Sequence, residues 1–222
     1  MEEVQYNLKT VQIEAISEFE KSKAYFIFKR LIDIIGSLCG IILLSPVMII
    51  TAIAIKLTSK GPVFFAQERV GQFGEVFKMY KFRSMVQDAE ELLSRLKDKN
   101  EMSGPMFKMK DDPRITSVGR FIRKTSIDEL PQLINVLKGE MSLVGPRPNL
   151  PREVIKFTEH QRLKLVAKPG LTCFWQVMGR SSIGFEQWME LDIRYIKERS
   201  TWVDIKLILK TFLVLFGDDN AM

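Results

Sequence analysis

The chain has 222 residues, 46% of them hydrophobic and 27% charged, which is enough for one compact domain with a hydrophobic core. Its net charge of +6 and sequence pI of about 9.3 indicate an anionic partner, which could be phosphate, nucleic acid or a membrane surface. Two cysteines and one histidine exclude a disulfide framework, a zinc ligand set and most histidine-based catalysis.

The first segment, residues 1–23, is polar and rich in acids. Its scattered apolar residues, from Val11 to Phe19, are compatible with a weak amphipathic helix. A loosely held extension explains the segment equally well. We therefore expect an N-terminal extension over residues 1–23, in one of these two forms.

The uncharged run from Ile34 to Ile55 is the strongest feature of the chain. It is as long as the roughly 20 apolar residues that a helix needs to span a bilayer. It starts too deep in the chain, and is too long, for a cleaved signal peptide. A buried core helix of a soluble protein is the alternative, but such a helix usually carries a polar face.

Two features favour a helix that returns to the side from which it enters. Ser45-Pro46 lies in the middle of the run, where proline removes a helix hydrogen bond and predicts a kink or break. Basic residues, which prefer the cytoplasm, flank the run on both sides: Lys29, Arg30, Lys56 and Lys60. We therefore expect a re-entrant membrane helix over residues 24–60, broken at Ser45-Pro46, rather than a spanning one.

A domain with a short β-hairpin is predicted to follow, over residues 61–222. Residues 63–67 and 76–82 have strand patterns on either side of a glycine-containing turn at 71–74. Residues 86–97 are expected to form a charged helix, and residues 98–114 a loop.

The remainder is predicted to be helix-rich, which gives an α+β fold class. Helices are expected over 128–137, 153–166, 185–199 and 201–216, with a proline-rich loop at 145–151. The last helix is strongly apolar, so it lies either in the core or in the membrane interface.

The pair Asp128-Glu129 is the first candidate for chemistry. Ser126 and Glu129 have the spacing of a capping box, so the acids could simply cap a helix. Pro131 favours a start at Ile127 or Asp128, because proline in the first turn loses no helix hydrogen bond. A helix start also favours an ionised carboxylate and attracts phosphate. A carboxylate held there could attack phosphorus, and its neighbour, which points elsewhere, would have another task.

Basic residues could surround a phosphate beside this pair. Arg123 stands just before the helix start, and Lys81 lies on the second predicted strand. Arg147 lies between two prolines, which nearly lock its backbone and prepare its guanidinium to bind phosphate. Each of these residues alone could equally be a solvated surface charge.

Motifs along most of the chain, from about Phe28 to Phe216, resemble one known family. They are Lys29-Arg30-x-x-Asp33, Ser45-Pro46, Gly61-Pro62-Val63-Phe64-Phe65, Lys78-Met79-Tyr80-Lys81-Phe82-Arg83, Asp112-Pro113-Arg114, Ser126-Ile127-Asp128-Glu129-Leu130-Pro131, Val144-Gly145-Pro146-Arg147-Pro148 and Lys168-Pro169-Gly170. In this order the sequence resembles the bacterial sugar transferases, the monotopic polyprenol-phosphate phosphoglycosyl transferases. The resemblance implies a re-entrant helix broken at Ser-Pro and a catalytic domain on the cytoplasmic face of the bacterial inner membrane.

The resemblance also implies a reaction. Asp128 would attack the phosphorus of a UDP-sugar nearest the sugar, UMP would leave, and polyprenol phosphate would then take the phosphosugar from the aspartate. Glu129 is implied in binding Mg²⁺ or in proton handling, with Asp192 as a second metal ligand. Lys81, Arg123, Arg147 and Arg180 match positions associated with substrate phosphates.

The implied partners are a UDP-sugar, polyprenol (undecaprenyl) phosphate and membrane lipids, in the first membrane step of surface glycan assembly. The region from Gly104 to Arg114 looks more like members that handle simple hexoses, but the sequence does not name the sugar or the oligomeric state. The alternative is a non-catalytic, membrane-anchored basic module that binds anionic lipid or nucleic acid.

Overall fold

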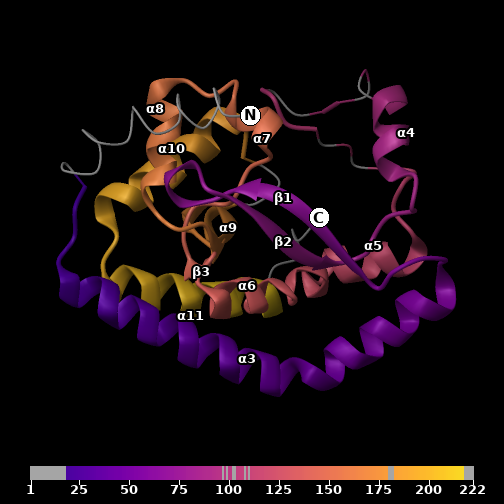
Figure 1. Ribbon diagram of the computed structural model, residues 1–222, viewed down its shortest axis with the longest axis horizontal. Helices are drawn as coiled ribbons and strands as arrows, with labels where there is room; N and C mark the ends of the chain where they lie inside the picture. Colours follow the sequence, from indigo (N-terminus) through magenta and orange to yellow (C-terminus); the bar gives the residue numbers. More distant parts are fainter. Residues whose placement is uncertain are drawn as a thin grey trace.

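The computed structural model describes residues 19–217, apart from residues 97, 99, 102, 103, 108, 110 and 180–182 and the side chains of 215–217. Most of the expected N-terminal extension, residues 1–18, lies outside the described residues. The described part is a helix-rich α+β fold with a long apolar helix near its N-terminus and two small sheets (Figure 1).

The long apolar helix, α3 (Lys23–Thr58), starts where the Ser22 side chain accepts a hydrogen bond from the Tyr25 amide, at 3.2 Å. It continues through Pro46, so the expected break at Ser45-Pro46 is wrong. Proline removes the amide that would have donated to the Ile42 carbonyl. The Ser45 hydroxyl donates to that carbonyl instead, at 2.8 Å, which allows the helix to remain continuous.

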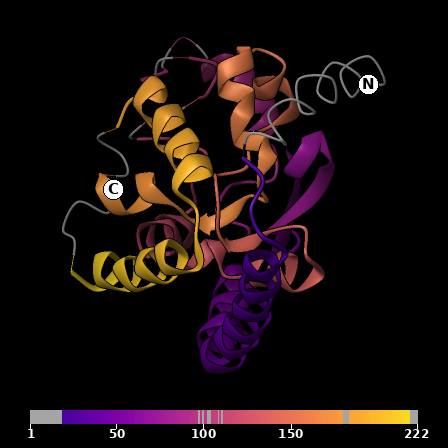
Figure 2. The same ribbon diagram turned by 90° about the vertical axis from the view of Figure 1, so that its left-hand side faces the viewer.

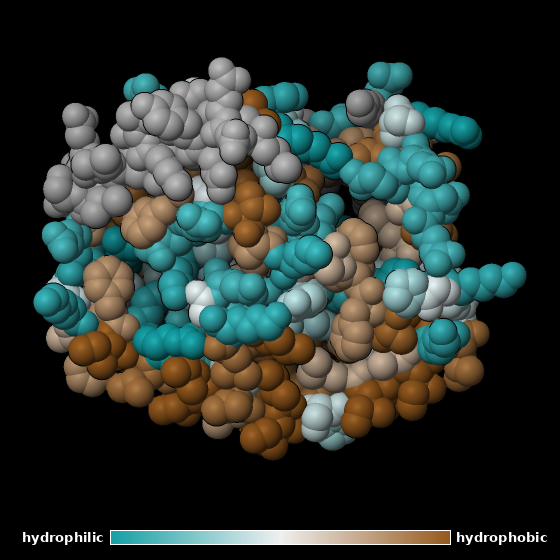
Figure 3. Space-filling view, viewed as in Figure 1, coloured by the Kyte–Doolittle hydropathy of each residue, from teal (hydrophilic) through white to brown (hydrophobic). Residues whose placement is uncertain are grey.

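Helix α3 is bent and lies along the base of the molecule (Figure 1). In the described part of the chain it is the one helix long and apolar enough to span a membrane. Large apolar side chains are exposed along it, among them Ile35, Leu43, Ile50 and Leu57. Figure 3 shows the result as a brown apolar belt beneath a largely polar body. Such a continuous exposed apolar surface indicates membrane association.

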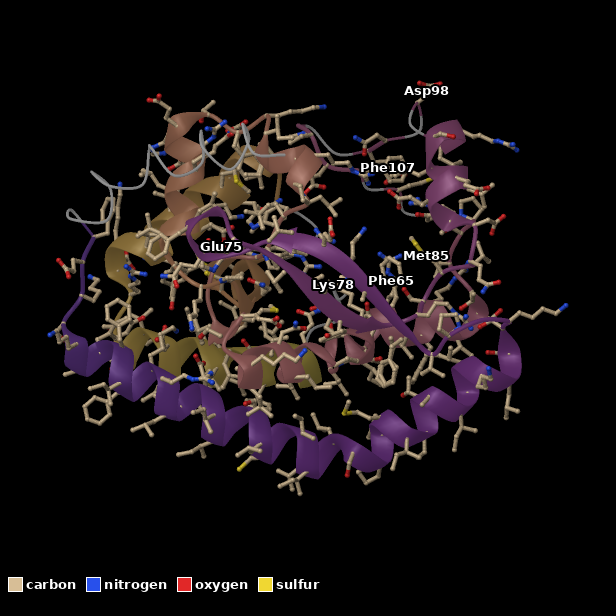
Figure 4. All side chains as sticks on the ribbon, viewed as in Figure 1. Phe65, Glu75, Lys78, Met85, Asp98 and Phe107 are labelled. Atoms are coloured by element: carbon tan, nitrogen blue, oxygen red, sulfur yellow. The ribbon has the colours of Figure 1, made fainter. Side chains whose placement is uncertain are left out.

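The predicted hairpin is confirmed as β1 (Phe64–Val70) and β2 (Val76–Phe82), which pair antiparallel around a short 3₁₀ helix, η1 (Gln72–Gly74). The second strand has the predicted bounds, whereas the first extends three residues further. Phe65 pairs with Lys81 in the register. Figure 4 shows Glu75 at the turn and Phe65 toward the opposite end, which places Lys81 away from the turn.

The segment after the hairpin contains one expected helix and one unexpected one. Helix α4 (Ala89–Leu96) lies inside the predicted range 86–97. Helix α5 (Ser117–Lys124) was not anticipated; Thr116 starts it by accepting a hydrogen bond from the Gly119 amide at 2.9 Å. The predicted helix over 128–137 divides into a 3₁₀ turn, η3 (Ile127–Glu129), and α6 (Gln132–Lys138), which ends at Gly139 as expected.

Two short parallel strands, β3 (Ser142–Val144) and β4 (Gly170–Thr172), were not predicted. Their backbones approach closely after Val144. A Cβ atom added to Gly145 would lie 2.2 Å from the Lys168 carbonyl oxygen, and one added to Gly170 would lie 2.0 Å from the Gly145 nitrogen. Only glycine fits at these two positions without moving backbone, so this pair of strands depends on both.

The single helix predicted over 153–166 is wrong. The segment contains α7 (Pro151–Val154), α8 (Glu159–Arg162) and the 3₁₀ helix η4 (Leu163–Val166). The interruption has a local cause, because Thr158 and Gln161 form a capping box that begins a new helix. A further short helix, α9 (Phe174–Met178), follows β4.

The two C-terminal helices agree with the predicted ranges, as α10 (Phe185–Glu198) and α11 (Thr201–Gly217). Helix α10 packs inward through Trp188, Met189 and Ile196. Helix α11 lies beside α3 at the base (Figure 2), and Asp204 accepts hydrogen bonds there from Tyr25 and Lys29. The body therefore rests on a base formed by α3 and α11.

Candidate active site

Four of the candidate residues, from three separate elements, meet at one place. Asp128 and Glu129 lie on η3, Lys81 on β2, and Arg147 in the loop after β3. The Lys81 ammonium lies 2.7 Å from Glu129 Oε1 and 3.9 Å from Asp128 Oδ2. Arg147 Nη2 lies 3.0 Å from the same Glu129 oxygen. The site therefore holds two carboxylates and two cations in direct contact.

The backbone around the acids starts at Ile127, one of the two expected helix starts, but as a 3₁₀ turn. Ser126 adopts the left-handed region, with φ of 57°, and its side chain caps no amide. Ser126 therefore occupies the N-cap position, but the capping box that the sequence suggested is not formed. The tight 3₁₀ turn is closed by the Leu130 amide, which donates to the Ile127 carbonyl at 3.2 Å. A non-glycine residue in this region is uncommon and is often found at functional sites.

Glu129 is held as an anion. Burial alone would raise the pKa of its carboxyl, but the charges of Arg147 and Lys81, and the hydrogen bonds from both, lower the pKa well below its ordinary value. Glu129 is therefore a fixed negative charge that orders the two cations around it.

Asp128 has the opposite electrostatic balance. It is 6% exposed, and burial raises the pKa of its carboxyl. Lys81 opposes this shift and the negative charge of Glu129 adds to it, so the pKa lies above the ordinary value of 3.8. Burial also lowers the pKa of Lys81, against the effect of the two acids. Two neighbouring carboxyls pushed in opposite directions are characteristic of sites that divide chemical tasks.

Arg147 is positioned by its loop and by an aromatic face. Its guanidinium carbon lies 5.5 Å from the centre of the Trp175 ring, a cation–π distance. Close to the loop, the Gly145 amide donates to the Thr172 carbonyl and the Gly170 amide to the Pro146 carbonyl. The Glu129 charge raises the pKa of Arg147, so it stays protonated.

The other candidate residues have different environments. Arg123, at the end of α5, is exposed, and its charge lowers the pKa of Asp128 without a direct ion pair among the described contacts. Asp192 on α10 is fully buried and lies 2.6 Å from the Lys164 ammonium. Arg180 lies outside the described residues.

Sequence reasoning did not single out three polar residues near this site: the half-buried Arg69 and the buried Asn149 and Lys164. The Lys164 ammonium donates to Asn149 Oδ1 at 2.7 Å, and Arg69 Nη1 donates to the Pro148 carbonyl at 3.3 Å. Asn149 is the one with a sequence signal, since it directly follows the Pro-Arg-Pro motif. The partners of the other two come from distant positions, which no local pattern reveals.

The site could take part in binding Mg²⁺ together with a phosphate ligand. No group of three acidic, histidine or cysteine side chains gathers within the described part of the chain. Mg²⁺ is commonly bound by one or two carboxylates plus substrate phosphates and water, so Glu129 beside Asp128 fits such an ion. Asp192 fits poorly, because its side chain is 0% exposed, whereas the Glu129 side chain is 20% exposed.

Comparisons with known proteins give matches over most of the chain. A family model described as bacterial sugar transferase matches residues 24–218. The chain is 49% identical over 87% of its length to the galactosyl transferase CpsE of Streptococcus agalactiae, and 44% identical over 87% to the undecaprenyl-phosphate galactose phosphotransferase of Salmonella typhimurium. It covers 43% and 41% of those two proteins. It is 40% identical to the uncharacterized sugar transferase EpsL of Bacillus subtilis, over 83% of this chain and 85% of that one.

Proposed function

The chain belongs to the bacterial sugar transferase family, and on that basis we propose that it transfers a sugar-1-phosphate from a UDP-sugar to polyprenol phosphate, releasing UMP. Relatives named for undecaprenyl-phosphate sugar transfer support this proposal. The observation that carries it is the buried Asp128, 3.9 Å from the Lys81 ammonium, next to Glu129, which lies 2.7 Å from Lys81 and 3.0 Å from Arg147. The product would start a surface glycan on its lipid carrier.

In the first step, a carboxylate oxygen of Asp128 attacks the donor phosphorus that bears the sugar. A bond forms between this oxygen and phosphorus, and the bond between phosphorus and the bridging oxygen of UMP breaks, so UMP leaves with the electron pair. Lys81 and Arg147 offset the negative charge that spreads over the phosphoryl oxygens. Their contact with Glu129 fixes their positions before the donor binds.

In the second step, a phosphate oxygen of polyprenol phosphate attacks the same phosphorus. The bond to Asp128 breaks, and the carboxylate returns to its starting state. The raised pKa of Asp128 suits the first step, because a buried carboxylate with little solvation is a better nucleophile than an exposed one. Mg²⁺, held by Glu129 and the donor diphosphate, would add positive charge at the diphosphate.

UMP release from a panel of UDP-sugars tests this proposal directly. The relatives' names include galactose and N-acetylgalactosamine, so the panel contains UDP-galactose, UDP-glucose and UDP-N-acetylgalactosamine, each with Mg²⁺ and with or without undecaprenyl phosphate. We expect lipid-dependent UMP release with at least one hexose donor. A binding module without catalysis would release UMP with none of them.

We further propose that α3 is re-entrant and that the domain lies at the cytoplasmic face of the inner membrane. Both ends of α3 contact the same body. Near its start, Arg30 donates to the Val136 and Leu137 carbonyls at the end of α6, each at 2.7 Å. Near its end, Ile55 packs against Phe82 and Ile122. A helix that crossed the membrane would carry one end away from that body.

Cysteine accessibility tests this topology. Single cysteines at Lys23 and Glu75, introduced into a Cys39→Ser background, are expected to react with a membrane-impermeant maleimide from the cytoplasmic side only. A cysteine at Leu43, close to the bend, serves as the matched control and should resist labelling from either side in intact membranes. Reaction of the cysteines at positions 23 and 75 from opposite sides would establish a spanning helix instead.

The raised pKa of Asp128 predicts the pH dependence of the first step. Only the ionised carboxylate attacks, so the rate of adduct formation should fall as pH decreases through the Asp128 pKa, above the range of an ordinary aspartate. Glu129→Gln removes a charge that raises this pKa. The acid limb of the variant's pH–rate profile should therefore move to lower pH, even if its maximal rate drops. Single-turnover labelling with radioactive donor across a pH series measures the acid limb for the wild type and for the variant. A shift of this limb to higher pH in the variant would contradict the assignment of Asp128 as the titrating nucleophile.

A further inference from the structure

A buried network of polar side chains contacts the loop that carries Arg147. Lys164 is at its centre, 2% exposed, with its ammonium 2.6 Å from Asp192 and 2.7 Å from Asn149 Oδ1. Asn149 is 1% exposed and donates in turn to Glu153 Oε2 at 3.1 Å. The same Glu153 oxygen accepts from the Leu150 amide at 3.0 Å. This polar network thus joins α10, η4, the loop and α7.

This polar network holds the part of the loop that follows Arg147 in the sequence. The Asn149 carbonyl accepts from the Val70 amide at 2.9 Å, which attaches the loop backbone to the end of β1. Next to it, the Pro148 carbonyl accepts from Arg69 Nη1. On the near side, the loop is held by the backbone contacts with β4. Arg147 therefore projects from a segment that is anchored before and after it.

The composition of this polar network indicates that it does more than stabilise the fold. A well-packed apolar cluster of similar volume is often as stable as a buried ion pair, or more stable. Directional hydrogen bonds, however, hold a backbone in one place, and Asn149 makes two of them, one from Lys164 and one to Glu153. Asn149, two residues from Arg147, is the member through which such an effect would matter for the site.

We propose that Asn149, held by Lys164, is a positioning residue that sets the place of Arg147 without itself touching substrate. Asn149 fixes where the loop leaves the body, and Arg147 then reaches Glu129 and the donor phosphates from a defined point. This inference rests on the proposed function, because the phosphate is the group that Arg147 would bind. Misplacement of a phosphate-binding group by about 1 Å can cost about 100-fold in rate.

A double-mutant cycle between Asn149 and Arg147 tests this inference, with kcat and donor KM for UMP release as the readout. Asn149→Ala should lower kcat/KM about 10- to 100-fold, through a higher donor KM as well as a lower kcat. Arg147→Gln should lower it by at least as much. In the double variant, Asn149→Ala should add almost no further loss, because Arg147 is the group through which Asn149 acts.

Two further variants make the cycle decisive. Gln161→Ala removes a buried amide on α8 and should leave the kinetics unchanged. Asn149→Ser, which keeps a hydrogen-bonding oxygen, is carried through the same cycle in case the alanine variant does not fold. Equal fold losses from the Asn149 variant in both backgrounds, or a wild-type rate for it, would overturn the positioning role alone. A wild-type rate for Arg147→Gln would overturn both this role and the phosphate-binding role of Arg147.

Discussion

Asp128→Asn is expected to abolish transfer and the covalent adduct while the protein still associates with membranes. The amide has nearly the same shape as the carboxylate but cannot form the bond to phosphorus. Loss of a nucleophile typically lowers the rate by a factor on the order of 10⁴ to 10⁶. We therefore expect UMP release at least about a thousandfold below wild type, and no labelled protein after incubation with radioactive donor.

The control for this variant is Asp88→Asn, which makes the same change at an exposed position before α4. It should retain wild-type turnover and labelling. Membrane association of all variants is followed by flotation with vesicles, because α3 and not Asp128 provides the exposed apolar surface. Normal turnover by Asp128→Asn would show that another group attacks the donor, whereas normal labelling with slow turnover would place the defect in the second step.

Asp192→Asn is expected to have the largest effect on stability. Asp192 and Lys164 form an ion pair with both side chains at most 2% exposed. Removing one partner of a buried ion pair typically costs about 3–5 kcal/mol, because the remaining charge is left in a poorly solvating environment. We expect a loss of this size in the free energy of unfolding, measured by denaturant titration in detergent micelles.

A matched control comes from the same helix. Arg194 and Glu198 form an exposed ion pair four residues apart on α10, and Glu198→Gln should cost less than about 0.5 kcal/mol. The double variant Asp192→Asn with Lys164→Met removes both buried charges and should recover much of the lost stability. If Asp192 instead binds Mg²⁺, Asp192→Asn would unfold like wild type yet need a higher Mg²⁺ concentration for activity.

Features that depend on short stretches of chain could be predicted. The alternation at 76–82 gives β2 its bounds, and the uninterrupted apolar run over 34–55 predicts the central part of α3. The effect of Pro46 could not be predicted in the same way. Its result depends on whether the Ser45 hydroxyl takes over the freed carbonyl or the chain breaks, a difference decided by one hydrogen bond. The split of 153–166 at Thr158 is similar, because a local capping box outweighed the helical pattern.

Local sequence patterns are sufficient to identify the chemical inventory of this protein: an apolar helix with basic flanks, an adjacent pair of acids, and an arginine locked between prolines. Which of these charges meet is set by the packing of the fold. Lys81 lies 48 residues before Glu129, and Arg147 lies 18 residues after it. Their meeting depends on the packing of β2 and η3 and on the β3–β4 pair, whose close contact requires Gly145 and Gly170. The physical reason is that propensity and periodicity act over a few residues, whereas burial and charge pairing act across the fold, so opposite pKa shifts in two adjacent acids arise only after folding.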